Sequence, residues 1–125
     1  MPTQPKRKTI NLSVFQGEAR RVRMKFYDTD KALIDVSSWG FECLVRDASD
    51  AVIGTFSTDV VTEDADGGPI THVSTGIVDL VFNETWTGAT DAAYDKWDVL
   101  VTPDDRRPFF PFGGVIQIKQ PVTRP

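Results

Sequence analysis

The sequence predicts an all-β protein, an antiparallel β-sandwich of about seven or eight strands with one short helix before a late strand. Apolar and polar residues alternate along many short segments, and stretches rich in Gly, Pro and Asp separate those segments. The 125 residues, of which 40% are hydrophobic and 26% charged, suit one globular domain. We therefore expect a basic amino-terminal arm over residues 1–9, a sandwich over 10–120 and a carboxy-terminal tail over 121–125.

Alternation of period two identifies the strands. Basic and apolar residues alternate strictly after Arg21, so a strand there would place Val22, Met24 and Phe26 on one face. The expected strands cover residues 10–15, 21–26, 41–45, 51–57, 59–62, 76–82, 97–101 and 116–118. Their large aromatic and aliphatic residues are sufficient to fill the space between two packed sheets.

The connections contain residues that favour turns. Residues 27–31 and 47–50 have the lengths and polar side chains of hairpin turns, and residues 64–69 give the strongest loop signal. A helix is expected only where Asn83 or Thr85 can cap it, ahead of a late strand. A glycine in that stretch limits the prediction to one or two turns.

Charge is divided unevenly along the chain. Residues 1–25 hold seven basic residues and one acid, a net charge of +6, whereas residues 26–125 hold seven basic residues and seventeen acids, a net charge of −10. The leading basic residues form two groups, one in the arm (Lys6, Arg7, Lys8) and one along a predicted strand (Arg21, Arg23, Lys25). Such a segment can bind nucleic acid, or the acidic surface of an identical or related subunit.

Nucleic acid is the less favoured of these two partners. The basic residues could contact phosphates, but the rest of the chain is acidic. The row formed by Arg21, Arg23 and Lys25 also lacks interleaved aromatic residues on which bases could stack. We therefore expect a protein partner.

Several other classes of protein are disfavoured. No segment reaches the roughly 18–20 consecutive apolar residues of a membrane-spanning helix, and the basic start lacks the apolar stretch of a signal peptide. A single cysteine excludes an internal disulfide, and one cysteine with one histidine excludes the common zinc-site spacings. We expect a soluble domain made inside a cell, with no cofactor and no membrane partner.

No enzyme motif is found. His72 is the only histidine, follows a Gly-Gly-Pro segment and has no accompanying nucleophile motif, so we interpret it as an ordinary loop residue. Cys43 lies between Phe41 and Val45 on the apolar face of a predicted strand, which favours a buried, inert thiol. These residues predict that the protein is not an enzyme.

An acidic stretch raises the question of calcium. Asp59, Glu63, Asp64 and Asp66 could converge on a hard cation that prefers oxygen ligands. Their spacing does not follow the calcium-loop pattern, so a solvated acidic turn is the preferred interpretation. We predict no metal site here, and calcium remains the alternative.

One aromatic segment exceeds what a small core requires. Phe109, Phe110 and Phe112 lie among two prolines, which argues against a regular central strand and favours a loop. Successive side chains would point to opposite sides, so at least one phenylalanine should reach the surface. The loop could pack over one end of the sandwich, or it could contact another protein.

Several short motifs together resemble a known family. These motifs are Gln16-Gly17-Glu18, Leu33-Ile34-Asp35-Val36-Ser37-Ser38-Trp39, Val45-Arg46-Asp47, Tyr94-Asp95-Lys96-Trp97-Asp98-Val99 and the closing stretch from Gly114 to Arg124. Their order is similar to that of the small immunoglobulin-like β-sandwich domains of tailed-bacteriophage structural proteins, such as the amino-terminal domain of upper baseplate and related tail accessory proteins. This resemblance implies an immunoglobulin-like fold and no catalytic residues.

These observations predict a non-enzymatic structural protein of a phage virion, made in the cytoplasm of the host bacterium. We expect it in the tail, baseplate or adaptor region, in symmetric contact with copies of itself and with other virion proteins. The basic arm and the segment Phe109–Phe112 are the expected contacts, with Arg21, Arg23 and Lys25 as a charged rim. A capsid decoration protein is the first alternative, and a module that binds nucleic acid or the host is the second.

Overall fold

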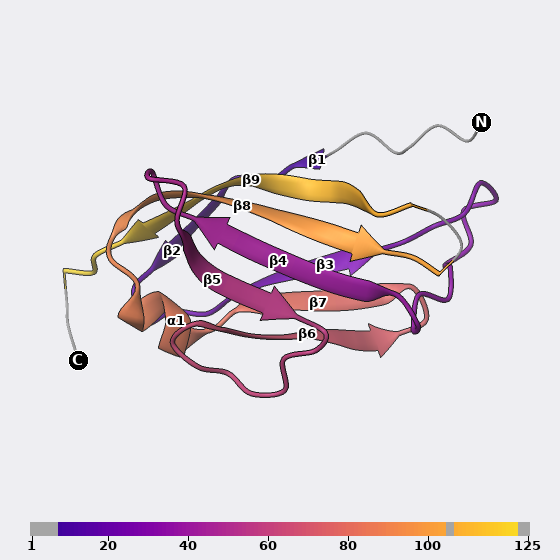
Figure 1. Ribbon diagram of the computed structural model, residues 1–125, viewed down its shortest axis with the longest axis horizontal. Coiled ribbons are helices and arrows are strands. Elements are labelled where there is room, and N and C mark those ends of the chain that lie inside the picture. Colours follow the sequence, from indigo (N-terminus) through magenta and orange to yellow (C-terminus); the bar gives the residue numbers. More distant parts are fainter. Residues whose placement is uncertain (1–7, 105–106, 123–125) are drawn as a thin grey trace.

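Nine strands and one short helix follow one another in the computed structural model, which describes residues 8–104 and 107–122 (Figure 1). The first strands are β1 (Lys8–Thr9), β2 (Leu12–Phe15), β3 (Arg20–Lys25), β4 (Gly40–Arg46) and β5 (Val52–Ser57). They are followed by β6 (Gly67–Ser74), β7 (Ile77–Phe82), α1 (Glu84–Ala89), β8 (Ala93–Thr102) and β9 (Phe109–Lys119). The all-β prediction, with one short helix before a late strand, is confirmed.

The strands form two layers of one curled sheet. In Figure 1 the layer of β9, β8, β4 and β5 lies in front of the layer of β7 and β3. Strand β6 joins the layers, because its first residues pair with β5 (Thr55 opposite Gly67) and its later residues pair with β7 (Ile70 opposite Leu80). Strands β1 and β2 both pair with β9 at the other side of the front layer.

The core lies between the layers and follows the predicted alternation. Val22 and Met24 of β3 point inward, as do Trp97, Val99 and Val101 of β8. An aromatic cluster fills the end of the core near α1. Its ring centroids are 5.2 Å apart for Phe56–Phe82, 5.3 Å for Phe56–Trp86 and 5.7 Å for Phe82–Trp97.

The expected antiparallel pairing is incomplete. Within the described residues, β1 and β2 both run parallel to β9, and β5 runs parallel to β6. The predicted strand at 59–62 does not form, and these residues belong instead to the long connection that carries the chain back to the start of β6. A connection of this length lets the chain re-enter beside β5 in the same direction, which a tight hairpin cannot do.

The glycines interpreted as a loop open strand β6. Gly67 has a φ of +152°, and a Cβ on it would lie 1.6 Å from the carbonyl oxygen of Thr55. The backbones of β5 and β6 therefore approach so closely that only glycine is accommodated. Composition indicated a loop, whereas contact with a strand distant in sequence made the segment part of the sheet.

The aromatic segment is also a strand, which corrects the predicted loop. Phe109, Phe110 and Phe112 belong to β9, which lies between β8 and the pair β1 and β2. Val99 pairs with Phe112 and Val101 with Phe109, so β9 has one extra residue between these pairs. This β-bulge contains Pro111 and interrupts the ladder where proline cannot donate a hydrogen bond.

The short helix α1 has six residues and forms as predicted after Asn83. The Asn83 side chain accepts a hydrogen bond from the backbone N–H of Trp86 at 2.7 Å, which caps the helix. Thr85, the other predicted cap, lies inside the helix. In the described part of the chain no helix has the length and apolar character needed to cross a membrane.

Candidate functional site

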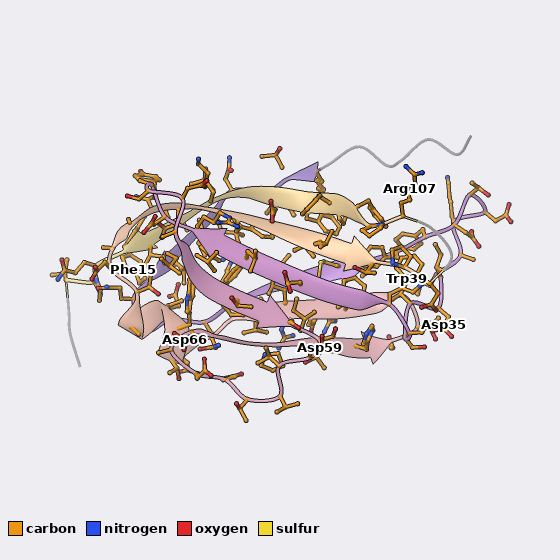
Figure 2. All side chains as sticks on the ribbon, in the orientation of Figure 1. Phe15, Asp35, Trp39, Asp59, Asp66 and Arg107 are labelled. Atoms are coloured by element: carbon orange, nitrogen blue, oxygen red, sulfur yellow. The ribbon has the colours of Figure 1, made fainter. Side chains whose placement is uncertain are left out.

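A cleft of about 780 Å³ opens where three segments meet at the α1 end of the sandwich. The segments are the turn between β4 and β5, the residues just before β6, and the connection from α1 to β8. Figure 2 shows Asp66 near α1, at this end of the molecule. Among the described lining residues are four aspartates (Asp47, Asp66, Asp91, Asp95) and no lysine or arginine.

The Asp47 carboxylate is held by its own turn. Its Oδ1 atom accepts hydrogen bonds from the backbone N–H groups of Ser49 at 2.9 Å and Ala51 at 3.0 Å. The turn is closed by Asp50, which adopts a left-handed conformation with a φ of +67°. This local network fixes one acidic wall of the cleft.

The wall before β6 is tied to β5. The backbone N–H of Thr55 donates to the carbonyl oxygen of Asp66 at 2.7 Å, and the N–H of Asp66 donates to Oδ1 of Asp64 at 2.8 Å. Asp66 is exposed, so its charge remains in contact with water. The backbone at this wall is therefore ordered by bonds that leave the Asp66 side chain at the surface.

Trp86 supports the cleft from the core side. Its indole Nε1–H donates to the carbonyl oxygen of Ile53 at 2.9 Å. A Cβ on Gly54 would lie 2.8 Å from that same Nε1 atom, so glycine permits the indole to lie against the β5 backbone. The adjoining connection is fixed by Thr90, whose hydroxyl donates to the Trp86 carbonyl oxygen at 2.7 Å. The cleft is thus largely pre-formed.

Asp95 is the unusual residue of the cleft. It lies on β8 at an inward position, on the same face as Trp97, and is only 2% exposed. Its Oδ2 atom has no hydrogen-bond partner. Burial raises the pKa of Asp95, and the nearby negative charge of Asp47 raises it further. A buried carboxylate without a compensating donor is costly, which makes the cleft a candidate binding site.

Only some of the predicted basic residues are available to bind a partner. Lys6 and Arg7 lie outside the described residues, and Lys8 is exposed on β1. Arg21, Arg23 and Lys25 point outward from β3, as the alternation predicted. No local pattern in the sequence indicates that Asp79 of β7 binds Arg23 and Arg21 of this row.

Arg23 forms a two-pronged ion pair with Asp79. Its Nε and Nη2 atoms lie 2.8 Å and 3.0 Å from the two carboxylate oxygens, and Nε of Arg21 lies 3.7 Å from Asp79. The hydrogen bonds from Arg23, together with the positive charges of Arg23 and Arg21, lower the pKa of Asp79. Part of the predicted charged rim is thus neutralised within the chain.

The three phenylalanines have different surroundings. Phe109 is buried, and Phe112 is partly buried with its ring 6.2 Å from that of Phe26. Phe110 is 48% exposed, in agreement with the prediction that at least one of these rings reaches the surface. A partner can therefore contact Phe110 directly, whereas Phe109 belongs to the core.

Neither Cys43 nor His72 has a hydrogen-bonded catalytic partner among the described residues. Cys43 is fully buried, as predicted, and burial raises the pKa of its thiol well above the ordinary value. His72 lies on β6 rather than in a loop, with its ring centroid 5.5 Å from that of Phe41 and its Nδ1 atom without a hydrogen-bond partner. Across residues 8–104 and 107–122 no three His, Cys, Asp or Glu side chains are grouped to hold a metal ion.

No family model matches the chain, and no curated protein matches it. One solved structure that is similar is a family 123 glycoside hydrolase from Clostridium perfringens, with 13% sequence identity and a TM-score of 0.39. The match covers 93% of this chain and 24% of that protein, so the chain spans about a quarter of its length.

Sequence reasoning missed the cleft. The signal for Asp95 was present, because the alternation of Trp97, Val99 and Val101 extends back to position 95 and places an acid at a core position. The convergence of Asp47, Asp66 and Asp91 with Asp95 left no such local pattern. It depends on three connections brought together by the fold.

Proposed function

We propose that this chain is a non-enzymatic structural protein of a tailed-bacteriophage particle, in the tail, baseplate or adaptor region. In that role it binds copies of itself and other virion proteins. The order of short motifs that resembles phage β-sandwich proteins supports the phage assignment. The observation that supports assembly best is the separation of charge, with a basic leading segment and an acidic cleft in one chain.

The described residues also support a role without catalysis. Cys43 is buried with a raised pKa and cannot readily act as a nucleophile. The ring of His72 packs edge-on against Phe41, and its Nδ1 atom has no hydrogen-bond partner. A β-sandwich with charged connections suits a subunit that is held by its neighbours.

The exposed ring of Phe110 provides a second contact. It projects from β9, and burial of an aromatic ring at an interface can anchor a complex whose charged groups set its orientation. We expect Phe110→Ser to weaken assembly more than it lowers the free energy of unfolding of the monomer. Equal losses would instead assign this ring to the packing of the sandwich.

Imaging of particles tests the location. We expect particles that carry a labelled copy of this protein to show the label at the tail, repeated around the tail axis. Label spread over the head shell would replace this proposal with a capsid decoration protein. Absence of the protein from purified particles would overturn both assignments.

A DNA-binding assay separates the remaining alternative. At low salt, where contacts to phosphates are strongest, we expect no retardation of duplex DNA by the full chain. Retardation that weakens steeply with added salt would identify a nucleic-acid-binding module. It would also assign Lys6, Arg7 and Lys8 to phosphates rather than to a protein.

A further inference from the structure

The charge of Asp95 has no counterpart within the cleft. The side chain is 2% exposed, its Oδ2 atom lacks a hydrogen-bond partner, and the described lining residues include no lysine or arginine. Carboxylates in such surroundings are stabilised by a cationic donor, which supplies both charge and hydrogen bonds. The missing group is therefore a cation that enters from outside the domain.

An ammonium or guanidinium group fits this cleft better than a metal ion. Calcium and magnesium require several oxygen ligands around one point. Among the described residues, no three His, Cys, Asp or Glu side chains lie close enough together to hold a metal ion. An arginine can bridge carboxylates through several directed N–H donors, and a lysine can approach them as a point charge. The oxygen atoms of Asp95 and Asp47 are suited to such donors.

The cation should belong to a positively charged segment, because the cleft carries several aspartates. Lys6, Arg7 and Lys8 form the densest basic run in the chain. Strand β1 runs parallel to β9 and pairs Lys8 with Phe112, whereas Asp95 pairs with Ile116 farther along β9. The chain thus enters β1 at the end farther from its own cleft, and a second copy is the better donor.

We propose that the cleft formed by Asp47, Asp66, Asp91 and Asp95 binds the basic arm of a second copy of this chain, with Lys6 or Arg7 meeting Asp95. This inference rests on the proposed function and names the contact by which copies associate. Because the arm and the cleft are different surfaces, the contact is head-to-tail. Repetition of a head-to-tail contact closes into a ring when the rotation permits.

A peptide of residues 1–9 tests the site directly. The receptor is the full chain with Lys6→Gln, Arg7→Gln and Lys8→Gln, which leaves the cleft free of its own basic arm. We expect the fluorescently labelled peptide to bind, and Asp95→Asn in the receptor to weaken binding by about tenfold or more, because a charged hydrogen bond is lost. Asp59→Asn is the matched control, since Asp59 is exposed, lies outside the cleft and is well separated from Asp66 in Figure 2.

Mixing two defective chains tests the direction of the contact. The neutral-arm variant retains its cleft, and Asp95→Asn in the otherwise unchanged chain retains its arm. We expect each variant alone to remain monomeric in sedimentation and the mixture to form a heterodimer. The unaltered chain should form larger assemblies that dissociate as salt is raised.

Three results would overturn the proposal. They are absence of peptide binding, equal binding by the Asp95→Asn and Asp59→Asn receptors, and displacement of the peptide by calcium at concentrations that leave an Asp95→Asn receptor unaffected. The last result would assign the cleft to a metal ion. If the protein is found in particles but does not bind the peptide, only this inference fails. If it binds the peptide but is absent from particles, only the virion assignment fails.

Discussion

Asp79 on β7 and Asp95 on β8 are both buried aspartates on strands, 8% and 2% exposed, yet their surroundings are opposite. Asp79 points outward and is covered by Arg23 and Arg21, which bond to it and lower its pKa. Asp95 points inward, has an unpaired oxygen and has a raised pKa. Burial alone therefore does not decide whether a carboxylate stabilises the folded protein. The deciding factor is whether a partner is available to its charged form.

The two layers therefore differ in what their buried aspartate does for the protein. The layer of β3 and β7 satisfies its buried acid within the chain, which stabilises the sandwich. The layer of β8 leaves its buried acid for an outside cation, which costs stability in the free protein. Such an arrangement is expected at a binding site rather than in a purely structural core.

The largest expected effect comes from the junction that joins the layers. Gly67→Ala places a Cβ 1.6 Å from the Thr55 carbonyl oxygen at a φ of +152°, so β6 must separate from β5. We expect a loss of roughly 3–5 kcal/mol in the free energy of unfolding, measured by chemical denaturation. Both the Asp79 pair and the cleft should be disturbed, since β6 pairs with both layers.

Gly88→Ala in α1 is the matched control. Its Cβ would lie 3.8 Å from Gly17, an ordinary contact. Alanine is favoured over glycine inside a helix by about 1 kcal/mol. We expect no loss of stability, and a loss as large as that of Gly67→Ala would contradict the structural account of the β5–β6 approach.

Removing the charge of Asp79 should have the next largest effect. Asp79→Asn replaces charge-assisted hydrogen bonds to Arg23, and we expect a loss of about 2 kcal/mol in the free energy of unfolding. Adding Arg23→Gln to this variant should lower the free energy of unfolding little further, because the ion pair is already broken. Full additivity of the two substitutions in denaturation experiments would show that they do not act on one interaction.

Removing the charge of Asp95 should act in the opposite direction. Asp95→Asn keeps the shape of the side chain and removes a buried charge that lacks a partner. We expect a higher midpoint of denaturation at pH 7 and weaker self-association in sedimentation. A lower midpoint would mean that the negative charge is already compensated in the free protein, and the contrast with Asp79 would fail.

The smallest effect is a difference in pH dependence. The lowered pKa of Asp79 contributes stability that is present above its ordinary value of 3.8 and is lost as the pH falls through the folded-state pKa. The raised pKa of Asp95 has the opposite sign, so its cost is present at neutral pH and is relieved as the pH falls through the folded-state pKa. The difference in unfolding free energy between the unaltered chain and Asp95→Asn should therefore shrink on mild acidification, while that for Asp79→Asn should persist. Denaturation curves across this range measure both.

Much of the fold could be predicted because alternation is a local property. Val22, Met24 and Phe26 face the core as expected, and Cys43 is buried between its neighbours on β4. The helix begins at the residue that caps it, since an Asn side chain bonds to the third residue after it in sequence. These outcomes needed no knowledge of which strands are neighbours.

The sequence by itself therefore determined which side chains of the alternating segments face inward and where the helix begins, because those features depend on residues a few positions apart. Tertiary structure decided that β1 and β2 run beside β9, that Gly67 opens a strand, and that Pro111 lies at a bulge. It also decided that Asp79 has an ion-pair partner and that Asp95 has none among the described residues. Arg23 and Asp79 are 56 positions apart in sequence, and the acids around Asp95 come from separate connections, so only the packing of distant segments could pair one carboxylate and leave the other for a partner.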